Sequence, residues 1–158
     1  MKNPISNDVF DSRDLIEYID ELKEEIVDIW NDTMKRNLII ERVLEEDDEV
    51  EPLDEVLTFE DIDLDDERFS IIASEEILYL EKILEFESEL EMTDDYKYGI
   101  SIIHKDYFTE YCTEFLEEVG YVPKDFPTWI VIDYEATALN MRSDYFSTEY
   151  EGETYYTR

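Results

Sequence analysis

The chain has 158 residues and carries 46 acidic against 13 basic side chains, which gives a net charge of −33 and a pI near 4.1. Its length suits one domain, or one small core with an extended helical appendage. Because 43% of the residues are apolar and 14% are aromatic, the composition argues against intrinsic disorder. So acidic a surface repels nucleic acid and anionic membranes, and it attracts basic protein surfaces such as the clefts that hold DNA or RNA.

The cellular location follows from segments that the sequence lacks. Residues 1–10 hold no apolar run and no basic run, so no secretory signal is visible. No stretch approaches the ~20 apolar residues of a membrane span. The single cysteine, Cys112, has no partner for an internal disulfide. We therefore expect a cytoplasmic protein.

The N-terminal half predicts one long helix. Residues 1–10 are expected to form a loose leader, and Asp11 or Ser12 is the expected N-cap of the helix that follows. From there apolar residues recur at alternating spacings of four and three, the seam of a coiled coil or helical hairpin, which predicts a helix over residues 13–44. The residues with this spacing are Leu15, Ile19, Leu22, Ile26 and Ile29, and the pattern continues loosely through Met34, Leu38 and Val43.

A second helix is predicted beyond an acidic connector. Residues 45–67 contain many acids and no Lys or Arg, and Pro52 interrupts any helix there, so we expect an irregular connector. Ser74 opens the second helix, which packs antiparallel against the first. Residues 11–95 thus form an acidic helical hairpin. The apolar face of the second helix consists of Ile77, Leu80, Leu84 and Leu90.

The next segment changes from long helices to shorter elements. Residues 98–103 read as a short strand or extended entry. Asp106 is expected to cap a helix over residues 107–119, which ends at Gly120.

The C-terminal residues predict a helix and a β-hairpin. Residues 129–132 are apolar and β-branched, which fits either a strand or the lead-in to a helix capped by Asp133. Residues 145–158 predict a β-hairpin around the two-residue turn Glu151-Gly152. The expected fold class is therefore α+β: a long antiparallel helical hairpin, followed over residues 96–158 by a small α+β unit.

No residue pattern supports catalysis or metal binding. The one histidine, His104, has no evident nucleophile or orienting partner, and Cys112 fits a small buried hydrophobe better than a reactive thiol. Residues 61–65 resemble the start of a calcium loop, but Asp66 stands where glycine is required and Ile72 where glutamate is required. We expect no enzyme activity, no catalytic residue, no metal and no cofactor.

The acidic residues of the first helix form a pattern of their own. They lie on the faces opposite the apolar seam and, three or four residues apart, are roughly 5–6 Å from one another, close to the spacing of successive phosphates. A solvated helix face and a high-salt origin are alternative explanations. Like charges at this spacing destabilise a helix, so the excess of acids favours a functional role over an ordinary solvated face. The predicted partner-binding acids here and in the connector are Glu17, Asp20, Glu21, Glu24, Glu25, Asp28, Glu45, Glu46, Asp47 and Asp48.

Short aromatic and acidic motifs recur through the C-terminal part of the chain. They are Tyr98-Gly99, residues 104–111, residues 115–120, residues 132–135, Asp144-Tyr145, Gly152 and Tyr155. These motifs resemble phage-borne proteins related to the C-terminal part of the ArdA antirestriction family. Residues 8–16 are similar to the opening of the same phage proteins, which carry a helical hairpin ahead of the shared part.

This resemblance implies a function in a bacterial host cell. ArdA proteins are acidic DNA mimics that occupy the DNA-binding groove of type I restriction–modification enzymes, and residues 107–119 look like the family's acidic antirestriction segment. The N-terminal domain of full ArdA proteins is not recognisable here, which leaves a CRISPR effector, another defence complex or a polymerase as further targets. The C-terminal acids expected to bind the partner are Glu110, Glu114, Glu117, Glu118, Asp133, Glu135 and Asp144.

The sequence therefore predicts two alternative functions. The first is a DNA mimic that inhibits a host defence enzyme by occupying its basic cleft, without binding nucleic acid or membrane itself. The second is an acidic adaptor or chaperone for a basic protein, with the hairpin as an oligomerisation element such as a homodimer interface. The two differ because an adaptor does not compete with DNA for its partner.

Overall fold

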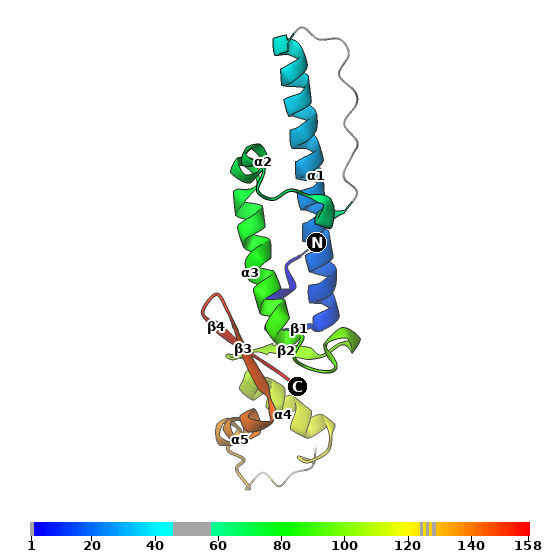
Figure 1. The fold of residues 1–158 in the computed structure, drawn as a ribbon. Helices are drawn as coiled ribbons and strands as arrows, with labels where there is room; N and C mark the ends of the chain where they lie inside the picture. Colours follow the sequence, from blue (N-terminus) through cyan, green and yellow to red (C-terminus); the bar gives the residue numbers. More distant parts are fainter. Residues whose placement is uncertain (1, 46–57, 124, 126, 128) are drawn as a thin grey trace. The chain divides into compact units, whose positions relative to one another are not determined.

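The structure is a computed structural model that describes residues 2–45, 58–123, 125, 127 and 129–158 (Figure 1). It contains a long N-terminal helix, further helices and a four-stranded antiparallel sheet, which confirms the α+β class. Two compact units are distinguished. The first comprises residues 18–84, and the second comprises residues 2–17 and 85–158.

The first unit is built on an antiparallel pair of helices (Figure 1). Helix α1 spans Ser12–Glu45 and helix α3 spans Ser74–Leu90, each within one residue of the predicted start. The hydroxyl groups of Tyr18 on α1 and Tyr79 on α3 lie 3.1 Å apart. A short helix, α2 (Glu67–Ile72), precedes α3, and its Phe69 meets Trp30 of α1 edge-on at 4.9 Å between ring centroids. The predicted helical hairpin is thus present.

The buried face of α1 follows the predicted seam and then departs from it. Leu15, Ile19, Ile26 and Met34 of the predicted seam are buried. Leu22 and Ile29 are half-buried, and Trp30, which was not predicted, is buried next to Ile29. A straight helix turns every 3.6 residues, so a stripe spaced at 3.5 drifts by about 20° per heptad and the neighbouring position takes over the core. The side chains of Leu38 and Val43 lie outside the described residues.

Helix α3 buries a similar face to the one predicted. Ile77 and Leu84 are only half-buried, because Ile83 and Phe86 occupy the centre of the face. The buried residues of α3 are Leu80, Ile83, Phe86 and Leu90.

The expected acidic connector lies partly outside the described residues. The described part begins with a 3-10 helix, η2 (Phe59–Asp61), in which the Thr58 hydroxyl donates to Asp61 Oδ2 at 2.7 Å. Ile62 then buries its side chain. The described end of the connector is therefore docked through an apolar residue.

The second unit contains the sheet, whose strand order is β1-β2-β4-β3 with every pair antiparallel (Figure 1). Its β-hairpin was predicted. At the turn Glu151 has φ 50° and Gly152 φ 85°, the left-handed conformations that a two-residue turn requires. The strands are β1 (Val9–Asp11), β2 (Ser101–His104), β3 (Phe146–Tyr150) and β4 (Glu153–Thr157).

The predicted loose leader over residues 1–10 is wrong where the chain enters this sheet. Strand β1 pairs with β2, so that Phe10 lies opposite Ile102 and both are buried. Pro4 and Ile5, in the 3-10 helix η1 (Pro4–Ser6), are buried as well. A three-residue strand is too short to show an alternating apolar pattern, so the sequence alone does not reveal it.

Two short helices complete the second unit. Helix α4 spans Phe108–Glu118, and Asp106 does not cap it, because the N-cap position falls on Tyr107 without a side-chain hydrogen bond. Helix α5 spans Tyr134–Met141 and has the predicted cap: Asp133 Oδ1 accepts from the backbone N–H of Ala136 at 2.9 Å. Residues 129–132 are the lead-in to α5 and not a strand. The core that joins these helices to the sheet consists of Ile103, Phe108, Cys112, Ala138 and Tyr156.

Ser12 connects the start of α1 to the segment before β2. Its buried Oγ donates to the Tyr96 carbonyl at 2.6 Å and accepts from the Ile100 N–H at 3.0 Å. Replacement by alanine leaves both backbone groups buried without this partner, so Ser12→Ala is expected to lower the free energy of unfolding by about 1–3 kcal/mol in urea denaturation. Ser88→Ala is the matched control, because Ser88 is exposed and bonds only within its own helix. Equal stability changes in the two variants would contradict the assignment.

Candidate partner-binding surface

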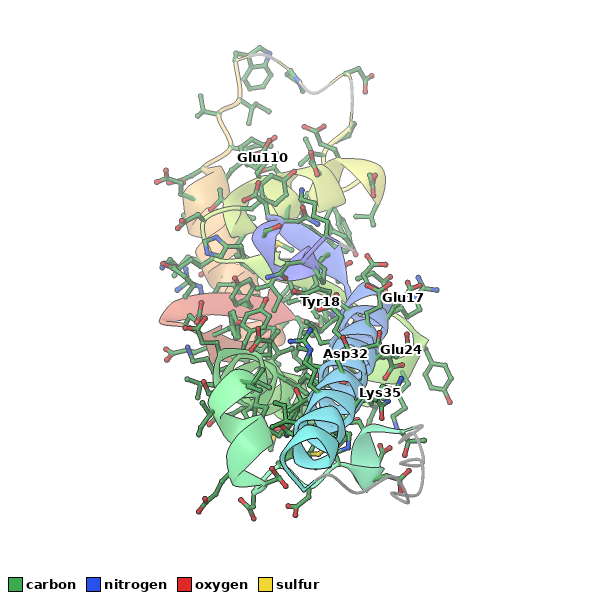
Figure 2. The ribbon with its side chains drawn as sticks, turned by 90° about the horizontal axis from the view of Figure 1, so that it is seen from above. Glu17, Tyr18, Glu24, Asp32, Lys35 and Glu110 are labelled. Carbon is green, nitrogen blue, oxygen red and sulfur yellow. The ribbon has the colours of Figure 1, made fainter. Side chains whose placement is uncertain are left out.

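The acids predicted on α1 lie on the outside of the helix. Asp20, Glu24 and Asp28 are exposed and opposite the buried side chains of Ile19 and Ile26. In Figure 2 the labelled Glu24 and Lys35 lie on the side of α1 away from α3. Spacings of four residues place neighbouring acids of this row roughly 5–6 Å apart. Glu17 precedes the row on α1 and is exposed, Glu25 is exposed, and Glu21 is half-buried.

The structure adds one acid that sequence reasoning missed. A groove of about 500 Å³ runs beside the row, and Glu60 of η2 lines it together with Asp20, Glu24 and Asp28. These four residues are called the α1 acidic groove. Lys23 also lines the groove, so the field there is negative but not free of cations. No sequence signal identifies Glu60, since its position depends on how η2 packs on α1.

Helix α4 carries the second group of predicted acids. Glu110, Glu114, Glu117 and Glu118 are all exposed, on the side of the helix away from Phe108 and Cys112. The Tyr107 hydroxyl donates to Glu114 Oε2 at 3.3 Å. Partial burial, together with the charges of Glu114 and Glu110, raises the pKa of Tyr107, so this hydroxyl stays a neutral donor within an acidic row.

The remaining predicted acids are divided between exposed positions and positions that the structure does not describe. Glu135 of α5 and Asp144 of the 3-10 helix η4 (Arg142–Asp144) are exposed. Asp133 is exposed, but its carboxylate is engaged as the cap of α5. The side chain of Glu45 lies outside the described residues, as do Glu46, Asp47 and Asp48.

Basic side chains of the second unit pair with acids outside the predicted set. Arg13 Nη2 lies 2.8 Å from Asp11 Oδ2, and this hydrogen-bonded contact lowers the pKa of Asp11. Lys105 bonds to Glu153 and lowers the pKa of that carboxyl group. Neither of these two pairs involves an acid of the α4 row.

His104 and Cys112 both pack against neighbouring side chains of the second unit. His104 Nε2 lies 3.5 Å from Glu153 Oε2, and its ring meets Tyr155 edge-on. Cys112 is buried in the core and burial raises the pKa of its thiol, as expected of a small hydrophobe.

Within the described part of the chain, no group of three or more His, Cys, Asp or Glu side chains is placed to hold a metal ion. Among the described helices, none combines the length and the apolar character that a bilayer crossing requires.

Comparison with protein-family models found no match to this chain, and comparisons with curated proteins and with solved structures found none either. The arrangement of the acids therefore carries the functional argument. On α1 and on α4 the arrangement is a row of exposed carboxylates anchored on one helix.

Proposed function

We propose that this protein is an acidic DNA mimic that inhibits a host defence enzyme by occupying its basic DNA-binding cleft. A type I restriction–modification enzyme is the first candidate target and a CRISPR effector the second. The observation that carries the proposal is the α1 acidic groove, where exposed carboxylates stand opposite a buried apolar seam.

The helix fixes the spacing of these charges before any partner arrives. Asp20, Glu24 and Asp28 lie on one helix whose opposite face is buried. The helix backbone therefore keeps the spacing between the three residues, even though each side chain can rotate. An ordered row of carboxylates can replace phosphates, because contacts to phosphate oxygens carry no sequence information. Acids preorganised in this way lose less entropy on binding than acids on a flexible chain.

The net charge adds a long-range component. A charge of −33 steers the protein toward basic clefts and raises the association rate at low ionic strength. The same charge favours basic protein clefts over nucleic acid, because nucleic acid is itself negative and repels the protein. Binding that depends on such charges weakens as salt screens them.

Competition with DNA tests the proposal. A purified type I restriction–modification enzyme is bound to labelled duplex DNA and titrated with this protein, and a CRISPR effector is titrated in parallel. We expect stoichiometric displacement of DNA from one of them. The direct affinity of this protein for that enzyme, measured without DNA, should fall at least about tenfold between roughly 50 and 200 mM salt. A partner recovered from bacterial lysate that binds equally well in saturating DNA would refute mimicry and favour an adaptor.

A further inference from the structure

The segment between α4 and α5 exposes large apolar side chains. Trp129 is 80% exposed, Val131 89% and Tyr121 74%, and Val119 and Ile130 are exposed as well. We call these five residues the anchor patch. Single exposed apolar residues are ordinary, but several in one short segment indicate an interaction surface.

The anchor patch borders a groove. The groove measures about 560 Å³ and is lined by Val122 and Pro123 after α4 and by Ile130 and Val131 before α5. The backbone N–H of Val122 donates to the Leu116 carbonyl at 3.1 Å, which turns the chain back over the end of α4. The groove therefore offers a mostly apolar recess that is lined in part by Ile130 and Val131 of the anchor patch, the two residues that follow Trp129 in the chain.

Negative charge surrounds this apolar surface. Glu117 lines the groove itself, and Glu118 ends α4 next to it. Asp133 and Glu135 stand at the start of α5 and are exposed. Residues 117–135 include these four acids and Asp125, against a single cation, Lys124.

We infer that the anchor patch docks on a basic protein surface where apolar side chains stand between Lys and Arg. Charge complementarity selects this occupant, because the acids around the groove require a cationic surround. A second copy of the chain would bring the same acids and the same net charge of −33 against them. An anionic membrane is repelled for the same reason.

This inference rests on the proposed function only for the identity of the partner, which we take to be the enzyme whose cleft the acidic rows occupy. Charge pairs at a wet rim govern association rate and specificity more than residence time. A buried Trp anchor contributes most where it is fully desolvated. The anchor patch would thus supply the apolar part of the affinity that carboxylates alone do not.

Trp129 reports its own docking. The chain has two tryptophans, and Trp30 is buried against Phe69. In a Trp30→Phe variant, emission therefore comes from Trp129 alone. The first probe is a helical peptide with a Leu stripe flanked by Lys, and the second is the same peptide with every Leu replaced by Gln. We expect the Leu-Lys peptide to shift the emission to shorter wavelength and to reduce acrylamide quenching, and the Gln-Lys peptide to do neither.

Two substitutions locate the contact. Val131→Ser is expected to weaken binding of the Leu-Lys peptide at least about tenfold, as loss of a central apolar contact does. Leu139→Ser is the matched control. Leu139 is also an exposed apolar residue of the second unit, but it lies on α5 outside the anchor patch, so less than about a twofold change is expected.

Each contrary outcome identifies a different error. If Trp129 emission and quenching responded equally to both peptides, or responded to neither peptide, no apolar docking would occur at Trp129. An emission shift that grows with protein concentration alone would assign the patch to a second copy, and a shift on phosphatidylglycerol vesicles would assign it to a membrane. All of these outcomes leave the DNA-competition result untouched, so the failure of this inference and the failure of the proposed function are distinguishable.

Discussion

Replacing Phe108 by alanine is expected to lower the free energy of unfolding by about 3–5 kcal/mol, the usual result for a fully buried phenylalanine. Phe108 is 2% exposed and joins α4 to the sheet. Its ring meets Tyr156 at 4.6 Å and Tyr145 at 5.0 Å between centroids, so truncation removes two aromatic contacts as well as apolar volume. Urea denaturation followed by circular dichroism measures the change.

Phe146→Ala is the control for this substitution. Phe146 belongs to β3 of the same unit but is partly exposed, so its loss leaves a smaller cavity and is expected to cost less than half as much as Phe108→Ala. If both variants lost the same stability, the cluster around Phe108 would not be the core that supports the α4 acids.

Strong local signals made much of the fold predictable. The repeated spacing of apolar residues indicated α1, and an acid-rich start indicated α3. The glycine after Glu151 indicated the hairpin turn, and Asp133 indicated the start of α5. Each of these features depends on residues within a few positions of one another, so a short stretch of sequence is enough to predict it.

Features that depend on distant residues were not predictable in the same way. Strand β1 exists because Val9 and Phe10 meet β2, which follows about ninety positions later. Asp106 does not cap α4 because the helix begins at Phe108, so that the N-cap position is Tyr107, one residue after Asp106. In the surface itself, Glu60 joins the acids of α1 only through tertiary packing. The exposure of Trp129 also escaped prediction, because an apolar run predicts burial equally well.

Neutralising the α1 acidic groove is expected to produce the largest functional effect. In the triple variant Asp20→Asn, Glu24→Gln, Asp28→Asn, three carboxylates that line the groove become uncharged amides of nearly the same shape. If each forms one close pair with a basic side chain of the target, worth about 1 kcal/mol or more, the loss totals about 3 kcal/mol. Inhibition of the target enzyme should then weaken at least about a hundredfold, measured by DNA competition. Stability should change little, because the three side chains are exposed.

The control for this variant removes the same net charge from another helix. Glu76, Glu81 and Glu85 are exposed on α3 and contribute nothing to the α1 acidic groove. Their replacement by Gln lowers the long-range attraction equally, so it should slow association slightly and reduce inhibition by less than about fivefold. A groove variant that inhibits as well as the α3 variant would mean that net charge alone binds the target and that the position of the α1 acids does not matter. A groove variant weakened a hundredfold beside a nearly unaffected α3 variant would instead place the mimicry on the surface of α1.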